Sequence, residues 1–433
     1  MKPVIINACW LIAERVLFGF SGVFISIYVA RYLQPAQFGT ISYLLSIVAI
    51  TVPLIQMGAD NILFNRIARN PQSGIRLMLA SARLRARWFT VTSAILLMWG
   101  WWYLEWTPFV MLVLVLISSY FQIQDVFKIY YDATLNSKRN TFINNGVLLL
   151  AILVRVAMVK YELSLVWFVM PYILSSAVPY LIRRAMFMRE HPAPAQMPAS
   201  RALTDRYSRY LMVVGLPLSL SALSIVIYTR IDQVMLESMV GAHAVGLYSA
   251  ATTLCYAWTF VPMALITSLM ATVVGARDAD EQADMIRMLF LIILIVMLPI
   301  VGFYLLFGGQ LLTMLFGAGF SEASAIVPLC TFTALCSVLG TLSMRVMVLY
   351  SGYRFIAFKM PLVALVNIAL NWMLIPRYGI AGAAMSTLVA EFLSFFLFNI
   401  FFRKGKITVL QLTCYQSIPV VNRKVKSYVK KFS

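Results

Sequence analysis

Histidine, cysteine and acidic residues are all scarce in this chain. Its 433 residues include two histidines, five cysteines and 16 aspartates and glutamates. His191 and His243 fall in predicted loops without nearby ligand residues, and the cysteines occur singly, without metal-ligand spacing or a disulfide framework. We expect the cysteines to be packing residues. The sequence therefore predicts no metal site and no other cofactor.

Long polar stretches are also missing. The chain is 61% hydrophobic, well above the ~45–50% apolar content of soluble domains. Apolar runs of ~20 residues recur along it, and each is long enough as a helix to cross a ~30 Å hydrocarbon layer. Lipid admits only helices or closed barrels, and continuous apolar runs favour helices over the short alternating strands of a barrel. The fold class predicted is an all-α polytopic membrane protein.

About twelve spans follow from these runs. The first carries Glu14 and Arg15 and lacks a small-residue cleavage site, so we expect a retained span rather than a cleaved signal peptide. The predicted spans are 7–29, 39–63, 88–104, 108–127, 141–160, 163–182, 211–233, 244–268, 286–307, 323–343, 357–376 and 379–402.

The net charge of +19 does not indicate a nucleic-acid binder, because the basic residues are distributed according to the predicted spans. When a residue at the very end of a span is counted with the adjoining segment, 29 of the 35 lysines and arginines fall on one side of the predicted membrane, three on the other side and three within spans. Basic residues concentrate on the cytoplasmic side of membrane proteins. We expect a multi-pass protein with both termini cytoplasmic and membrane lipids around it.

A proline-containing segment divides the spans six and six. It runs from His191 to Pro198, and its prolines cannot continue a helix. The two halves also echo each other, because Leu33 to Tyr43 and Val240 to Ala250 each join a first span to a second and place glycines 207 residues apart. Duplicated halves are typical of transporters. The predicted organisation is an N-terminal lobe 1–184, a cytoplasmic linker 185–209, a C-terminal lobe 210–402 and a basic cytoplasmic tail 403–433.

Four motifs carry a family resemblance. They are ARYLQPAQFG (30–39), MVGAHAVGLYSAA (239–251), LFGAGFSEA (315–323) and IPRYGIAGAA (375–384). With the span count, they make the chain resemble the Wzx-type O-antigen and polysaccharide flippases of the multidrug/oligosaccharidyl-lipid/polysaccharide (MOP) exporter superfamily. The resemblance implies two six-helix lobes around a central cavity in the bacterial inner membrane. It also implies export of undecaprenyl-diphosphate-linked oligosaccharide to the periplasmic leaflet, with polysaccharide polymerase and chain-length proteins as further partners.

Arginines within spans are candidate substrate ligands, because charge inside lipid is costly and usually faces a cavity or a partner. Arg155 shares a helix face with Asn144, eleven residues earlier. A guanidinium stays charged and offers five donors, which suits a diphosphate. The alternative for Arg155 and for Arg230 is snorkelling to the interface or pairing with a carboxylate.

Two embedded glutamates are the other charged candidates. Glu14 lies on a polar stripe of the first span beside Arg15, where it either lines the cavity or joins an interhelical hydrogen-bond seam. Glu391 lies near the centre of the last span, where it either couples transport to an ion or forms a structural ion pair. Asp125 and Lys128 share a helix face at the end of the fourth span and are either a gate or a solvated surface.

Competing functions are weighed by loop size and charge. The outer loops are too short for the catalytic groups of a membrane glycan polymerase, and no nucleophile or phosphate-loop motif occurs, so an enzyme is not predicted. A multidrug exporter of the same superfamily is the alternative, because one fold can serve several functions. Three arginines against two glutamates within the spans favour an anionic substrate.

Overall fold

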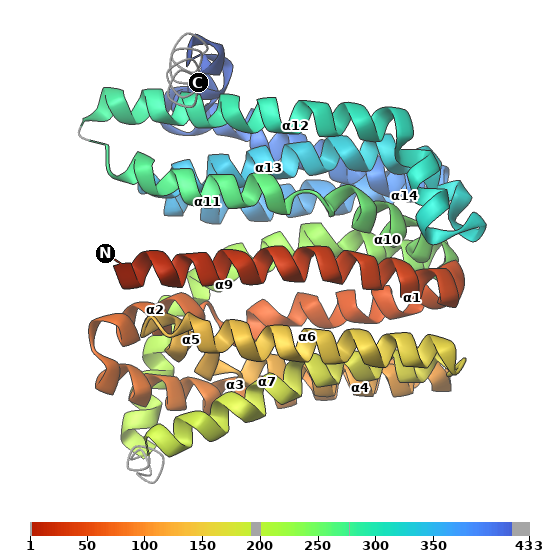
Figure 1. The fold of residues 1–433 in the computed structure, drawn as a ribbon, viewed down its shortest axis with the longest axis horizontal. Helices are drawn as coiled ribbons and strands as arrows, with labels where there is room; N and C mark the ends of the chain where they lie inside the picture. The colour runs from red at the N-terminus through yellow and green to blue at the C-terminus, as the bar shows by residue number, and fades with distance from the viewer. Residues whose placement is uncertain (1, 192–200, 277, 418–433) are drawn as a thin grey trace, which may run out of the picture. The chain divides into compact units, whose positions relative to one another are not determined.

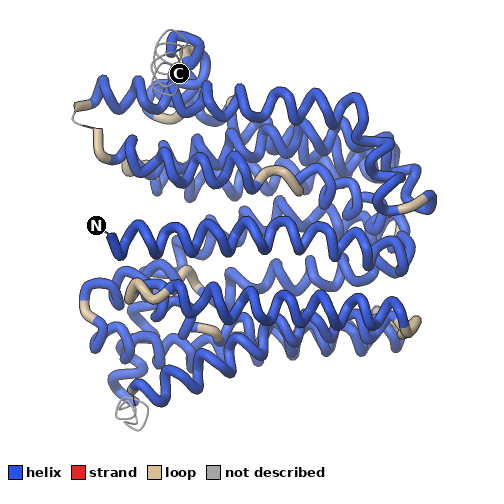
Figure 2. Tube along the Cα trace, in the orientation of Figure 1, coloured by secondary structure: helices blue, strands red, loops and turns tan. Residues whose placement is uncertain are grey.

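The computed structural model describes residues 2–191, 201–276 and 278–417, with side chains from Gly22 onward except at 201–214, 216–218 and 271. Within these ranges the chain is helical, with short loops and no strand (Figure 2). This confirms the predicted all-α class. The chain forms two compact units, Met1–Ser249 and Ala250–Ser433, which are described separately.

The first unit is built on the long helix α1, which packs against α4, α6 and α9, while α7 packs against α4 and α6 (Figure 1). The predicted linker 185–209 remains a prediction, since residues 192–200 lie outside the described part. The elements are α1 (Lys2–Gln56), α2 (Ala59–Arg69), α3 (Pro71–Tyr103), α4 (Trp106–Gln124), α5 (Val126–Ala133), α6 (Ser137–Lys160), η1 (Leu165–Val169), α7 (Met170–Glu190), α9 (Arg201–Met239) and the start of α10 (Ala242–Tyr256).

The second unit packs α13 against α12 and α14, and its C-terminal helix α15 contacts α12 and α13. Ile407 and Leu410 of α15 are buried, so the described part of the predicted tail is packed on the unit rather than free. The elements after α10 are α11 (Phe260–Val274), α12 (Ala279–Phe316), η2 (Ala318–Ile326), α13 (Val327–Leu349), α14 (Tyr353–Phe395), η3 (Leu397–Phe401), η4 (Arg403–Gly405), α15 (Lys406–Leu412) and η5 (Cys414–Ser417).

Two of the long helices are pairs of spans joined at a break. In α1 the break is Gln34, which has a φ of 62° and precedes Pro35. Proline disfavours helical geometry in the residue before it, so the chain turns at this point. In α14 the break is Gly379, with a φ of 53°, a value that glycine adopts without strain. Gln34 falls between the predicted spans 7–29 and 39–63, and Gly379 is the first residue of the predicted span 379–402.

Helix length and apolarity alone select seven membrane-crossing helices among the described residues, or eight if the bent pair α10 and α11 is one span. That selection treats the broken helices α1 and α14 as single spans, and it omits α3 and α9. All twelve predicted spans fall mainly in helices, although 39–63, 108–127 and 244–268 each run across a break between two helices. The polytopic architecture is therefore confirmed.

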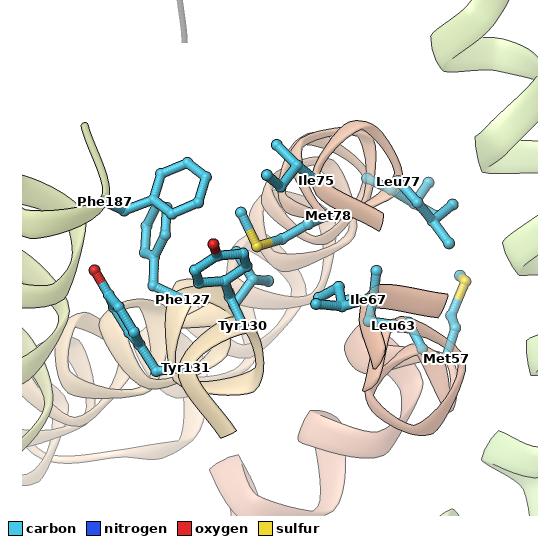
Figure 3. Packing of buried hydrophobic residues seen from close by; sticks show 13 residues of the cluster. Met57, Leu63, Ile67, Ile75, Leu77, Met78, Phe127, Tyr130, Tyr131 and Phe187 are labelled. Carbon is cyan, nitrogen blue, oxygen red and sulfur yellow. The ribbon is translucent and has the colours of Figure 1, made fainter. Parts of the chain in front are cut away.

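The segment 64–87, which lies between the second and third predicted spans, is helical and partly buried. Apolar side chains of α2, the start of α3, α5 and the end of α7 converge on one another, as Figure 3 shows for Ile67, Met78, Tyr130 and Phe187. The hydrophobic side of α2 explains this burial, since burying an apolar helix face stabilises a short helix that would be marginal alone.

The two motifs that echo each other in the sequence pack directly together in the first unit. A Cβ atom on Gly39 would overlap the carbonyl oxygen of Ala242, and one on Gly246 would overlap the carbonyl oxygen of Pro35. Pro35 and Ala242 are equivalent positions of the two motifs. The contact is therefore reciprocal, and glycine allows this close backbone approach.

Candidate functional site

A cavity of about 700 Å³ lies within the first unit. Its walls come from the second arm of α1, the turn that follows it, the start of α2, α4, α7 and α9. Its volume is in the range of sites for drug-sized ligands, ~300–1,000 Å³. The polar residues in its lining are Gln56, Asp60, Asn61, Ser118, Ser119, Gln122, Tyr172, Thr229 and Arg230.

Some of these polar groups already have partners in the protein. Ser118 donates to the backbone oxygen of Tyr172 at 2.9 Å, and Thr229 donates to that of Ile225 at 2.8 Å. Asp60 forms an ion pair with Arg85, which is buried and also donates to the backbone oxygen of Ile123 at 3.0 Å. These groups are satisfied without a ligand.

Other lining groups have no partner in the part of the chain that the structure describes. Ser119 is only 5% exposed, and its hydroxyl makes no hydrogen bond there. The amides of Gln56, Asn61 and Gln122 also make none within the described residues. An unpaired polar group that is shielded from water is costly, so the buried Ser119 hydroxyl favours a polar ligand, whereas Gln56 is half-buried and Asn61 and Gln122 are exposed.

Arg230, which the sequence suggested as a substrate ligand, lines this cavity of the first unit from α9. Its side chain is exposed, and within the described ranges it forms no ion pair or hydrogen bond. Asp60 is the acidic residue of the lining, and it pairs with Arg85. Among the described residues the Arg230 guanidinium has no counter-charge, and it can bind two oxygens of a phosphate at once.

Arg155 lies on α6 and is not part of the cavity lining. Its guanidinium stands over the ring of Tyr172, 4.9 Å from the ring centre, and Tyr172 does line the cavity. Among the residues described, Arg155 makes this cation–π contact and no ion pair. Arg155 therefore contacts the cavity wall rather than the cavity itself, because it packs on the ring of Tyr172. This contact joins α6 and α7, and a single sequence does not reveal it.

Asn144 is buried beside Arg183, which lies directly after the predicted span 163–182. Arg183 is in fact 1% exposed within α7. It pairs with Asp125, donates to Asn144, and donates from Nε to the side-chain oxygen of Asn140 at 2.9 Å. In the sequence Arg183 directly follows the predicted span 163–182 and precedes Arg184, a position typical of a cation outside the membrane, so this network was not predicted.

Asp125 belongs to this network rather than to an exposed helix surface. It is the N-cap of α5 and accepts a hydrogen bond from the backbone N–H of Lys128 at 3.3 Å. The backbone oxygen of Lys128 in turn accepts from the side-chain amide of Asn140 at 3.0 Å. The structure therefore joins the two predicted gate residues to α6 and α7.

Glu391 is buried in the second unit and is 3% exposed. Its carboxylate attracts Lys359, which is 2% exposed and donates to the side-chain oxygen of Asn399 at 2.9 Å. Lys359 is the third residue of the predicted span 357–376, where a cation is expected to reach water, so its burial was not predicted. The side chains of Glu14 and Arg15 lie outside those described. Within the described ranges no group of histidine, cysteine, aspartate and glutamate side chains is placed to hold a metal ion.

Comparison with known proteins places the chain in a family. Residues 7–276 match the family model described as polysaccharide biosynthesis protein. Over 199 residues the chain is 23% identical to the capsular polysaccharide biosynthesis protein CapF of Staphylococcus aureus. That match covers 45% of this chain and 50% of CapF, so it spans half the length of this curated relative.

Solved structures share the fold at low identity. An inward-facing multidrug resistance MATE family transporter of the MOP superfamily has a TM-score of 0.63 and 14% identity, over 94% of this chain and 99% of that one. A MOP superfamily transporter from Pyrococcus furiosus has a TM-score of 0.64 and 14% identity, over 94% and 96%. The lipid II flippase MurJ in an inward closed conformation has a TM-score of 0.59 and 12% identity, over 98% and 92%.

These likenesses confirm the resemblance drawn from the four motifs and the span count. The family model covers more than half of the chain, and the structural likenesses extend over nearly all of it. The chain has the fold of the MOP superfamily transporters and belongs to the polysaccharide biosynthesis protein family.

Proposed function

We propose that this protein is a flippase for lipid-linked oligosaccharide, moving undecaprenyl-diphosphate-linked repeat units of O-antigen or a similar surface polysaccharide. It works in the bacterial inner membrane, with both termini cytoplasmic, and carries the units from the cytoplasmic to the periplasmic leaflet by alternating access. Membrane lipids surround it, and polysaccharide polymerase and chain-length proteins are the partners expected to receive its product. The family membership supports the substrate class.

The observation that carries the proposal is the unpaired Arg230 in a polar cavity. A lipid-linked oligosaccharide has an anionic diphosphate and uncharged sugars. The cavity offers one guanidinium for the diphosphate and unpaired amides and a hydroxyl for sugar groups.

The same observation separates this proposal from the multidrug exporter. A site for a cationic drug needs an unneutralised carboxylate, because burying a cation without a counter-charge is costly. The acidic residue in the lining, Asp60, is paired with Arg85. The cavity therefore favours an anionic head group over a cationic one.

Deleting the gene tests the proposal in cells. The null strain is expected to lose surface polysaccharide and to accumulate undecaprenyl-diphosphate-linked repeat units, and re-expression is expected to restore export. Lipid extraction with mass spectrometry measures the accumulated intermediate. Full surface polysaccharide in the null strain, in a background without a second exporter, contradicts the flippase function.

A further inference from the structure

The polar groups of the cavity are distributed unevenly between its two ends. Ser46 of α1 contacts Gln233 of α9, and the backbone of Gly215 lies against the carbonyl of Met57. The helix α9 therefore runs antiparallel to the second arm of α1. Arg230 lies towards Leu45 and away from Gln56, and these two α1 residues are about 16 Å apart along the helix at 1.5 Å per residue.

Gln56, Asn61, Ser119 and Gln122 form the opposite end, which we call the amide end. Arg85 donates hydrogen bonds to Asp60 and to the backbone oxygen of Ile123. In the chain, Asn61 follows Asp60 and Gln122 precedes Ile123, so Arg85 brings these two amides close together. Ser119 and Gln122 are three residues apart in α4 and so share one helix face. These observations gather the four side chains at one end of the cavity.

The amide end has polar capacity without free charge. Asp60 and Arg85 neutralise each other there. Each amide offers two donors and one acceptor oxygen, and Ser119 offers one donor and an acceptor, none of which has a partner in the described part of the chain. Ser119 is the strongest of these observations, because its hydroxyl is hidden from solvent and still unpaired.

We infer that the amide end is the sugar-reading part of the cavity and that Ser119 and Gln122 are specificity-determining residues for the sugar next to the diphosphate. With the diphosphate on Arg230, the attached sugar extends towards α4, where its hydroxyl or acetamido groups pair with Ser119 and Gln122. A sugar lacking those groups leaves the buried Ser119 hydroxyl unpaired, which is the physical basis of discrimination, and it also forfeits a direct hydrogen bond to the exposed Gln122 amide. The inference rests on the proposed function.

Two lipid probes test it: undecaprenyl diphosphate without sugar, and undecaprenyl diphosphate bearing one N-acetylhexosamine. Binding is measured on the full chain in lipid nanodiscs for Ser119→Ala and Gln122→Met, which keep the side-chain size close to that of the wild type. Thr229→Val is the matched control, because Thr229 lines the same cavity but its hydroxyl is used by its own helix. Arg230→Ala reports on the diphosphate.

Ser119→Ala and Gln122→Met are each expected to weaken binding of the sugar-bearing probe by about three- to tenfold and to leave binding of the sugar-free probe unchanged. Arg230→Ala is expected to weaken both probes, and Thr229→Val neither. Equal losses for both probes in the Ser119 and Gln122 variants, or no loss for either, overturn the inference while Arg230 can still support the flippase. Failure of wild-type protein to bind either probe contradicts the proposed function and this inference with it.

Discussion

Arg183 is the buried charge whose removal is expected to cost the first unit most. It is 1% exposed, and its guanidinium serves Asp125, Asn140 and Asn144 at the same time. Arg183→Met removes the cation but keeps the aliphatic length. Asp125 is then a carboxylate left in a buried site, and the amides of α6 lose their donors.

Breaking a buried ion pair by removing one partner costs about 3–5 kcal/mol, which corresponds to a fall in Tm on the order of 10 °C for a unit of this size. The assay is thermal unfolding of detergent-solubilised protein, followed by size-exclusion chromatography with fluorescence detection. Arg184→Met is the matched control, because Arg184 is the exposed neighbour on the same helix.

The double variant Arg183→Met with Asp125→Asn separates the ion pair from general packing. Removing the stranded charge is expected to recover part of the lost stability, so the two substitutions are strongly non-additive. An Arg183→Met variant as stable as the Arg184→Met control refutes the reasoning. A double variant that loses the sum of the two single effects refutes the ion-pair explanation.

Three further predictions concern the motif contact, Arg155 and the topology. Gly39→Ala is expected to destabilise the protein by about 1–3 kcal/mol, because the added Cβ meets the Ala242 carbonyl. Gly146→Ala is the neutral control in the same unfolding assay, because Gly146 has open space around it. Equal Tm values for the two variants contradict the contact. Arg155→Ala and Tyr172→Leu are each expected to reduce export at unchanged protein level, and their effects are expected to be non-additive in the double variant. Tyr172→Phe keeps the aromatic ring and is expected to keep most of the export. Additive losses in the double variant argue against action of Arg155 through Tyr172. Cysteines introduced at Thr107 and Ser321 are expected to react with an impermeant maleimide in intact cells, whereas cysteines at Ser73 and Lys138 are not. Lys138 is chosen in place of its neighbour Ser137, which is buried. Labelling at Ser73 overturns the orientation.

The sequence predicted the spans well, because the apolar length needed to cross lipid is a local property. It also located the break at Gln34, between two predicted spans, where the following proline acts on its immediate neighbour. The partly buried helix α2 was missed because its partners in α5 and α7 come from later in the chain. Amphipathicity alone does not reveal those partners.

The candidate site was predicted unevenly for the same reason. The cost of charge in lipid pointed to Arg230 without knowledge of its neighbours, and Arg230 lines the cavity. Arg183 and Lys359 sit near predicted span ends, where a cation normally reaches water, so only their distant partners reveal that they are buried. Ser119 and Gln122 resemble ordinary helix residues until the lining of the cavity is known.

The central claim is that a cavity with a cationic Arg230 carries lipid-linked sugar across the membrane. Transport by purified protein in proteoliposomes tests it most directly. A fluorescent undecaprenyl-diphosphate-linked sugar is placed in one leaflet, and its appearance in the other is followed with a membrane-impermeant quencher. Wild-type protein is expected to move the lipid, Arg230→Lys to keep part of the rate, and Arg230→Ala to lose about 10- to 100-fold, as expected for charge-assisted hydrogen bonds. Movement by Arg230→Ala at the wild-type rate, at equal amounts of reconstituted protein, contradicts the account.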